Sequence, residues 1–350
     1  MIIYESTFVI NICKMENCKT FTVLVSLFFI SACSATDNDR YETVHFNEIA
    51  SLINEISLEV EALGATIRYR EHLNGFLIMD GSANKIYLFS DSGTLLHEVG
   101  GPGQGPGEFT SITSITSDEE GRIFAYDGPM WRLSIFDHSG NYTRSFQMNE
   151  AFRMHDMVYA NGLLYTFSGF THDELPFHIS AINPENGMIV NQFMESSDIV
   201  KELGIPISGA LQHINLFDDK IIVTHPLVLN TYFFDLEGSL LTIHQGNSSI
   251  YKDPDPDSYT IPAPLHTALP ALIASSRPAQ AKYFIEFMEL NPEDSRGNFL
   301  EIFDKDGNKL SDNPISIESR ELLHVNQNGE LLFIKRTESN GYSLNTYVLN

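Results

Sequence analysis

The chain has 350 residues, enough for one large domain or two ordinary ones, and 43% of them are hydrophobic, which argues against a disordered protein. Acidic residues outnumber basic ones by 46 to 21, so the formal net charge is -25. Such a charge repels phosphates and anionic lipid head groups. We therefore expect no nucleic-acid partner, whereas a cation, a basic peptide or a neutral sugar is electrostatically easier to bind.

An apolar run near the N-terminus, residues 21–32 (FTVLVSLFFISA), predicts a secretory signal peptide. Two basic residues, Lys14 and Lys19, precede the run. Its length is too short to cross a bilayer, which takes about 20 residues. Met15 heads a more typical signal peptide than Met1 does, so the true start of the protein is left open.

The apolar run ends in Ile30-Ser31-Ala32-Cys33, which resembles a bacterial lipobox, in which the cysteine is lipidated and becomes N-terminal. We expect a signal peptide over residues 1–32, lipidation of Cys33 and a tether over residues 33–41. The localisation expected from this is an outer-membrane lipoprotein, periplasmic or surface-exposed. An ordinary secretory signal with a chance cysteine is the alternative. The other two cysteines, Cys13 and Cys18, lie upstream of the cleavage point, which leaves no disulfide framework and no cysteine metal site.

Two turn signatures recur along the rest of the chain. The first is a polar or glycine turn followed by an apolar strand, and it occurs six times, at residues 74–78, 120–124, 161–165, 218–222, 281–285 and 328–332. The second is an apolar strand that runs into a polar turn with glycine, and it occurs five times, ending at Gly93, Gly140, Gly187, Gly238 and Gly307. Gly93 and Gly140 are 47 residues apart, and so are Gly140 and Gly187.

A repeat of about 40–50 residues with two hairpin turns and four short strands is typical of a propeller blade. We predict an all-β fold over residues 42–350, a six-bladed β-propeller with four-stranded antiparallel blades. The last blade, residues 322–349, has only three strands before the chain ends. We expect its fourth strand to come from the N-terminal segment near residues 42–46, which would close the ring and remove two sheet edges.

Two segments match each other at an offset of 47 residues and carry a family resemblance. They are Asp80–Phe89 (DGSANKIYLF) and Asp127–Phe136 (DGPMWRLSIF), and both resemble the NHL-repeat signature, with an Asp before a turn and a basic residue opening the next strand. The segment Gly100–Phe109 (GGPGQGPGEF) resembles the linker between blades in six-bladed propeller lipoproteins of Gram-negative bacteria. The resemblance implies the fold and hardly any function, because propellers host many unrelated activities.

The innermost strand of each blade lines the central channel, and one position per blade lies near the mouth that carries the long loops. Counting back seven residues from each first turn gives Arg68, Ser114, His155, His213, Ser275 and Leu322. His155 and His213 occupy matching positions in neighbouring blades, so they could share a ligand or a divalent metal ion. A hydrogen-bonded channel lining is the plainer interpretation, and no third metal ligand is evident.

Other candidates lie in the loops on the same face. Trp131 could stack on a sugar or cap a cation, although packing between blades is the commoner role. The acidic stretch Asp253–Asp257 could hold calcium but lacks the other ligands of an EF-hand. Residues 265–276 predict a short helix broken by Pro270, and residues 197–204 predict another. The glycines of 100–109 lack the Lys-Ser/Thr of a phosphate-binding loop.

Two functions therefore stay open. The first is a cell-envelope lipoprotein that binds a peptide, glycan or protein partner on its loop-bearing face, with candidate ligand-binding residues Arg68, Ser114, Trp131, His155 and His213. The second is a propeller enzyme of the lactonase, lyase or hydrolase type, with a metal at the channel mouth. No cofactor beyond a possible divalent cation is expected.

Overall fold

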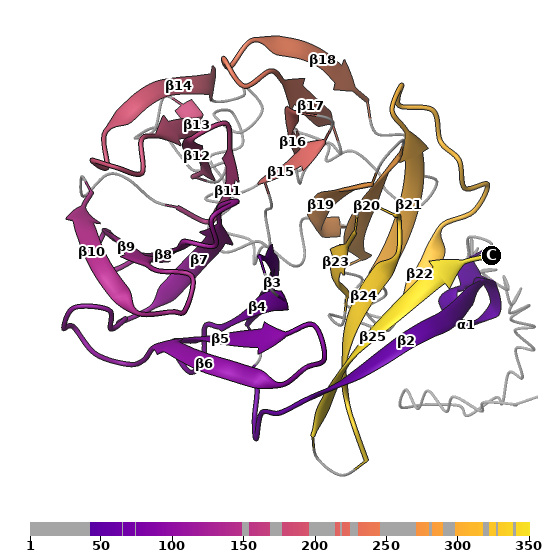
Figure 1. The fold of residues 1–350 in the computed structure, drawn as a ribbon. Coiled ribbons are helices and arrows are strands. Elements are labelled where there is room, and N and C mark those ends of the chain that lie inside the picture. Colours follow the sequence, from indigo (N-terminus) through magenta and orange to yellow (C-terminus); the bar gives the residue numbers. More distant parts are fainter. Residues whose placement is uncertain are drawn as a thin grey trace, which may run out of the picture. The chain divides into compact units, whose positions relative to one another are not determined.

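The computed structural model describes residues 43–64, 66–73, 75–148, 154–168, 177–195, 214–217, 219–224, 230–245, 271–279, 282–289, 298–317, 322–326, 328–338 and 341–350. These residues lie in one compact unit, Tyr41–Asn350. Within it the strands form six sheets arranged as a ring of blades (Figure 1). This is a six-bladed β-propeller, as the repeats predict. In the described part of the chain, no helix has the length and apolar character needed to span a membrane.

The first three blades follow one another along the chain, each with its strands in sequence order. Blade 1 consists of β3 (Ile67–His72), β4 (Gly75–Asp80), β5 (Lys85–Ser90) and β6 (Leu95–Gly100). Blade 2 consists of β7 (Ile112–Ser117), β8 (Ile123–Asp127), β9 (Arg132–Phe136) and β10 (Tyr142–Gln147). Blade 3 consists of β11 (Asp156–Ala160), β12 (Leu163–Phe167), β13 (Phe177–Ile182) and β14 (Ile189–Glu195).

The last three blades include the two that receive N-terminal strands. Blade 4 consists of β15 (Ile214–Phe217), β16 (Lys220–Thr224), β17 (Thr231–Phe234) and β18 (Leu240–His244). Blade 5 consists of β19 (Ala271–Ala279), β20 (Lys282–Glu289), β21 (Asn298–Asp304) and β22 (Ile315–Ile317), with β1 (Val44–His45) added at its edge. Blade 6 consists of β23 (Leu322–Val325), β24 (Leu331–Arg336), β25 (Tyr342–Leu349) and β2 (Ala50–Leu58).

The innermost strands surround the channel, and each contacts the innermost strand of the next blade. The sequence β3, β7, β11, β15, β19, β23 returns to β3, which makes the ring continuous (Figure 1). Between the blades lie apolar cores, such as the one that Leu77 and Ile86 of blade 1 form with Ile115 and Ile123 of blade 2. These apolar faces hold the blades together, because each sheet buries its two faces against its neighbours.

The second recurrent turn of the sequence packs each blade onto the one before it. Gly187, in the β13–β14 turn, has a φ of +71°, and a Cβ added there would lie 2.8 Å from Phe146 on β10 of the preceding blade. The turn at Gly307 lies against His244 on β18 in the same way, at 2.7 Å. Glycine is therefore needed at this position for two reasons, the left-handed backbone and the close approach of the neighbouring blade.

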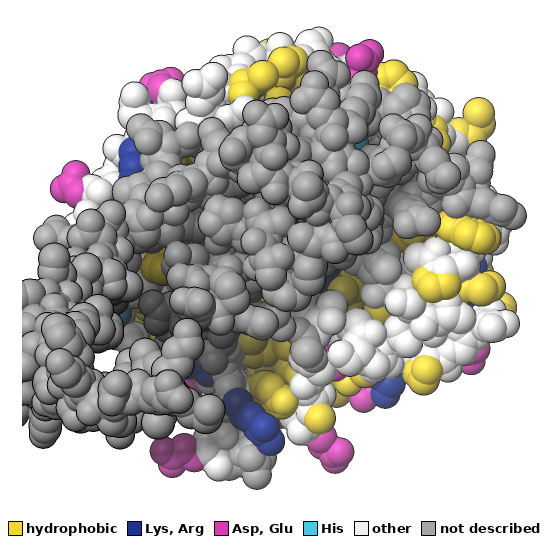
Figure 2. Space-filling view, turned by 180° about the vertical axis from the view of Figure 1, so that it is seen from behind, with side chains coloured by type: hydrophobic (Ala, Val, Ile, Leu, Met, Phe, Trp, Pro, Cys, Tyr) yellow, Lys and Arg dark blue, Asp and Glu magenta, His cyan; other side chains and the backbone are white. Residues whose placement is uncertain are grey.

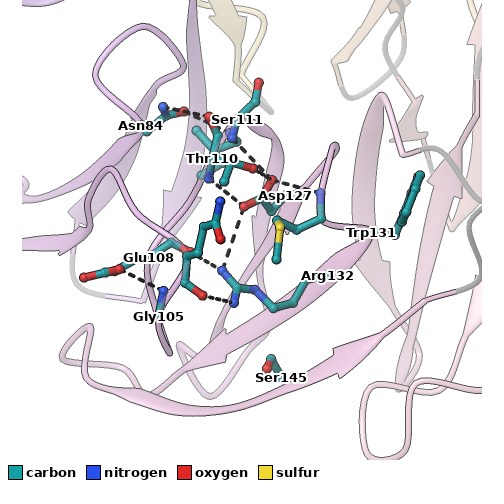
Figure 3. A network of polar contacts seen from close by, with 12 residues as sticks. Asn84, Gly105, Glu108, Thr110, Ser111, Asp127, Trp131, Arg132 and Ser145 are labelled. Atoms are coloured by element: carbon teal, nitrogen blue, oxygen red, sulfur yellow. Dashed lines mark hydrogen bonds and ion pairs between the residues drawn. The ribbon is translucent and has the colours of Figure 1, made fainter.

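The Asp and basic residue of the repeated segment clamp the linker between blades 1 and 2 (Figure 3). The Asp127 carboxylate accepts hydrogen bonds from the Thr110 backbone N–H and from the Thr110 hydroxyl, both at 2.7 Å. Arg132 donates to the carbonyl oxygens of Gln104, at 2.9 Å, and Glu108. The linker 101–111 is thus fixed to blade 2 by two side chains that the sequence pattern had singled out.

The N-terminal segment does not supply the strand at the predicted place. Val44–His45 form β1, which pairs in parallel with β22 of blade 5, and Phe46–Ile49 form the short helix α1. The fourth strand of blade 6 is instead β2, which pairs antiparallel with β25 from Ala50↔Leu349 to Leu58↔Tyr342. The placement at residues 42–46 is therefore wrong. Phe46 is buried against Phe333 and Tyr347, and this packing turns the chain before the strand begins.

The helix predicted over residues 265–276 is also wrong where the structure describes it. Residues 271–276 belong to β19, whose Ser275 pairs with Glu286 of β20. Pairing within a sheet outweighs the helical propensity of alanine and leucine, because that propensity contributes well under about 1 kcal/mol per residue. Residues 265–270, the predicted helix at 197–204 and the acidic stretch 253–257 lie outside the described residues.

Candidate functional site

A cluster of charged side chains crosses the channel between blades 1 and 3. Arg68 and Arg70 both lie on β3, two residues apart, so their side chains leave the strand on the same side. Both reach Asp156, the first residue of β11. The innermost strands run away from the long loops, so Asp156 and Arg68 lie near the mouth of the channel that carries those loops.

Asp156 is completely buried, and its carboxylate is surrounded by donors. One oxygen accepts from Nη2 of Arg70 and from the Met157 N–H at 3.0 Å, and Nη1 of Arg68 lies 3.4 Å away. The other oxygen accepts from the Ile214 N–H of blade 4 at 3.3 Å. A buried carboxylate needs this degree of compensation, because its desolvation costs several kcal/mol. Asp156 thereby joins the innermost strands of three blades.

The two arginines also donate hydrogen bonds to backbone carbonyl groups. Arg68 donates through Nη2 to the His155 carbonyl at 2.8 Å, and Arg70 donates through Nη1 to the Tyr69 carbonyl at 2.9 Å. Their side chains are 9% and 17% exposed. Within the described ranges, Nε of Arg70 is buried and has no hydrogen-bond partner. This donor of Arg70 suits a ligand group that accepts hydrogen bonds.

The predicted site residues separate into those at the channel mouth and those elsewhere. Arg68 and His155 lie together through the hydrogen bond between them. Ser114 is fully buried on β7, the strand between β3 and β11, and its hydroxyl lacks a hydrogen-bond partner among the described residues. Trp131 instead packs against the core between blades 2 and 3. His213 and Cys33 lie outside the described residues.

Arg70 is the residue of the cluster that the sequence analysis missed. The sequence analysis selected one residue in each innermost strand, by counting back seven residues from the first turn of the blade. In β3, however, two residues on the same side of the strand, Arg68 and Arg70, reach the channel. A second arginine two residues after Arg68 was the available signal. Asp156 stands next to His155 in the sequence, and it is the carboxylate rather than the imidazole that both arginines contact.

A metal shared by the two histidines, one of the alternatives left open by the sequence, is not tested, since His213 lies outside the described residues. Among the residues that the structure does describe, no three His, Cys, Asp or Glu side chains gather as they would around a metal ion.

The innermost strands of blades 6 and 1 are joined by a second polar contact. The His324 ring stacks on Tyr69 with 5.1 Å between centroids, and its Nε2 lies 3.5 Å from a carboxylate oxygen of Glu71. The contact with His324 lowers the pKa of the Glu71 carboxyl. Burial raises the pKa of the Tyr69 phenol, so this hydroxyl stays protonated at physiological pH. β3 is thus held by blade 6 on one side, through His324, and by blade 2 on the other.

Two solved structures show the same architecture at low sequence identity, and a third is less similar. A Bacteroides fragilis protein provisionally described as exported is 14% identical, with a TM-score of 0.71 over 89% of this chain and 98% of that one. A member of the DUF4221 family from Bacteroides vulgatus is 9% identical, with a TM-score of 0.59 over 86% of this chain and 99% of that one. Virginiamycin B lyase from Staphylococcus aureus is 15% identical, with a TM-score of 0.49 over 82% and 83%.

These similarities concern the fold alone. None of the curated proteins matches the sequence. A family profile does match it, over residues 31–247, which is more than half of the chain. The family is DUF5128 and its description is "6-bladed beta-propeller", in agreement with the six sheets of the structure. The chain belongs to this family of six-bladed β-propellers.

Proposed function

We propose that the chain is a lipid-anchored protein of the cell envelope that binds a peptide or glycan partner at the loop-bearing mouth of its channel. The observation that carries the proposal is the cluster of Arg68, Arg70 and Asp156. Ion pairs that merely stabilise a fold are usually exposed, whereas this cluster is buried and crosses the channel, and Nε of Arg70 has no hydrogen-bond partner among the described residues.

The guanidinium group of Arg70 favours a ligand that presents a carboxylate or several carbonyl oxygens. A guanidinium group binds such acceptors with two parallel hydrogen bonds, and burial strengthens each of them. The rest of the protein carries the opposite sign of charge, with a net charge of -25. A ligand with one acidic group at an otherwise neutral or basic contact surface therefore fits both the site and its surroundings.

The anchoring part of the proposal rests on the sequence. The lipobox-like Ile30-Ser31-Ala32-Cys33 follows an apolar run of signal-peptide length. The solved structure from Bacteroides fragilis, whose fold this chain shares, is provisionally described as an exported protein, which agrees with a protein that leaves the cytoplasm. A lipid on Cys33 would hold the propeller at a membrane surface through the tether 34–40.

The binding proposal is tested with arrays of defined peptides and glycans that carry or lack a free carboxylate. The wild-type chain is compared with Arg70→Met, and with Arg70→Met combined with Asp156→Asn. The double variant removes the arginine without leaving Asp156 as an anion that has lost one partner. We expect carboxylate-bearing members to bind the wild type and to lose at least about tenfold in affinity with both variants, because a charge-assisted hydrogen bond contributes about 1.5–3 kcal/mol.

Arg132→Met is the matched control, since Arg132 clamps the linker between blades 1 and 2 and lies outside the cluster. Its binding profile should follow that of the wild type. The proposal fails when the arrays give no ligand whose binding depends on Arg70, or when Arg132→Met changes binding as much as Arg70→Met does.

A further inference from the structure

The grooves between neighbouring blades repeat one arrangement on the face of the ring that carries the short turns. In two of these grooves, the side chain four residues after a turn glycine lies on the outermost strand and donates a hydrogen bond to the corresponding turn of the next blade. Arg144, four residues after Gly140, donates to the Glu185 carboxylate at 2.6 Å. Asn191, four residues after Gly187, donates to the Glu237 carbonyl at 2.7 Å. A polar side chain thus bridges these two grooves.

The groove between blades 2 and 3 is filled by a compact ion-pair cluster. Arg122, near the start of the second strand of blade 2, binds one oxygen of Glu185, and Arg144 binds the other. These hydrogen bonds, first from Arg122 and then from Arg144, lower the pKa of the Glu185 carboxyl. In this groove, therefore, a carboxylate lies between two basic side chains and forms an ion pair with each.

The groove between blades 4 and 5 has the same frame and lacks the bridge. On the strands of blade 4, Lys220 corresponds to Arg122 and Thr242 corresponds to Arg144. In the turn of blade 5, Asp306 corresponds to Glu185 and has a side chain one methylene shorter. In the part of the chain that the structure describes, no hydrogen bond or ion pair connects Thr242 or Lys220 to the turn of blade 5. A cavity of about 380 Å³ occupies the space instead.

The lining of this cavity combines apolar side chains, two lysines and the carboxylate of Asp306. Phe217 and Phe233 contribute to the lining although they are only 3% and 2% exposed, whereas Leu241 is 48% exposed. Lys220 is half-buried at one wall, and Lys305 projects from the turn of blade 5. Neither lysine has a carboxylate partner among the described residues, although acidic residues outnumber basic ones by 46 to 21 in the whole chain. A cavity of this size lies within the range of about 300–1,000 Å³ that small-molecule sites occupy.

We propose that the groove between blades 4 and 5 binds a small organic carboxylate with an apolar body. The carboxylate lies between Lys220 and Lys305 and forms an ion pair with each of them. Glu185 forms the equivalent ion pairs with Arg122 and Arg144 in the groove between blades 2 and 3. The apolar body packs against Leu241, which is about half exposed and lines the cavity. Because the cavity lies among the short turns, the site is separate from the channel mouth, and it does not depend on the function proposed for that mouth.

Exposed apolar side chains beside the cavity agree with a contact surface at this blade. Leu240, Leu241 and Ile243 of β18 are 50%, 48% and 41% exposed, and Leu241 also lines the cavity. Figure 2 shows hydrophobic side chains at the outer margin of the ring. His244, at the end of β18, is held by a 3.0 Å hydrogen bond between its Nδ1 and the Tyr283 hydroxyl and by packing on Phe233, so this wall of the cavity is fixed.

The test uses phenylacetate and its neutral analogue phenylacetamide, titrated into the full-length protein and followed by calorimetry and by the NMR signals of Gly307. We expect phenylacetate to bind saturably and phenylacetamide to bind at least about tenfold more weakly, a difference of about 1.4 kcal/mol. Lys220→Met and Lys305→Met should each weaken the binding of phenylacetate by about the same factor. Lys305 is exposed in a turn, so its replacement leaves folding intact.

Two variants change the bridging side chain: one adds an arginine to the groove between blades 4 and 5, and the other removes the arginine from the groove between blades 2 and 3. Thr242→Arg places an arginine opposite Asp306, as Arg144 lies opposite Glu185, and should abolish binding by filling the cavity. Arg144→Thr opens the other groove and should leave the binding of phenylacetate at Lys220 unchanged. The proposal is overturned if phenylacetate does not bind saturably, if phenylacetamide binds equally well, or if Thr242→Arg still binds phenylacetate.

Discussion

The guanidinium of Arg70, on the innermost strand of blade 1, contacts the carboxylate of Asp156 on the innermost strand of blade 3. Blade 2 lies between these two blades in the ring, so the contact crosses the channel rather than a blade interface. Asp156 also accepts from the N–H of Ile214 in blade 4. One carboxylate therefore fixes the relative positions of three blades at the channel mouth.

Removal of that carboxylate should cost more stability than removal of either arginine alone. Asp156→Ala leaves two buried guanidinium groups without their anion and the Ile214 N–H without its acceptor. We expect a loss of about 3 kcal/mol or more, since breaking a buried ion pair from one side typically costs about 3–5 kcal/mol. Arg68→Met should cost less, because Arg70 remains with Asp156. Urea unfolding of the three proteins gives the comparison, and equal losses would contradict the central role of Asp156.

The strand added by the N-terminal segment should be essential for the stability of blade 6. A chain that begins at Phe46 lacks β1 only, whereas a chain that begins at Glu59 lacks β1, α1 and β2. The second truncation exposes the edge of β25 and should lower the melting temperature far more, and also promote association between molecules. Deletion of residues 34–40 is the control and should have no effect. Similar melting temperatures for the chains beginning at Phe46 and Glu59 would count against this role of β2.

The contact between Glu71 and His324 should make part of the stability depend on pH. The pKa of the Glu71 carboxyl is lowered on folding from 4.5, so the ionised form contributes stability above about pH 4.5, and this contribution is lost as the pH falls through the folded pKa. The side chain is 56% exposed, so the effect should stay below about 1 kcal/mol. Glu71→Gln should therefore lose stability relative to wild type at pH 6 and approach it at pH 3.5. If urea unfolding gives the same difference in unfolding free energy between Glu71→Gln and the wild type at pH 6 and at pH 3.5, this prediction is wrong.

Trp131 should act in packing and not in binding. Its backbone has a φ of +45°, so Trp131→Asn keeps a residue that tolerates this conformation while removing the ring. We expect a loss of about 1–2 kcal/mol from reduced burial against the core between blades 2 and 3, with ligand binding unchanged. As the single tryptophan, it also reports on its own surroundings by fluorescence. A shift of that emission on adding a channel ligand would place Trp131 in the site after all.

Cys33→Ser should release the protein from membranes. A polar tether cannot replace acyl chains, whose burial contributes about 0.8 kcal/mol per CH₂ group. Fractionation of cells that express the wild type and the variant, together with metabolic labelling by a fatty acid, provides the measurement. A wild-type protein that carries no lipid would contradict the anchoring proposal, even if both forms were exported.

The sequence predicted the blades because their turns have strict local requirements. Gly187 must adopt a positive φ and lie against Phe146, so glycine recurs where each turn meets the preceding blade. The sequence did not predict Arg70 or the groove at Lys220 as sites, because these depend on which side chains meet across the channel and between blades. Residues 271–276 were misassigned to a helix because partners distant in the sequence, such as Glu286, decided their conformation.

The pairing of β2 with β25 determines which contacts must form for the ring to close. Ala50 and its partner Leu349 are 299 residues apart, whereas blades 1 to 4 consist of strands that follow one another along the chain. Contacts between distant residues form more slowly than local ones, so we expect blade 6 to be completed after blades 1 to 4. Until β2 and β25 meet, each has an unpaired edge that offers a pairing site to another molecule.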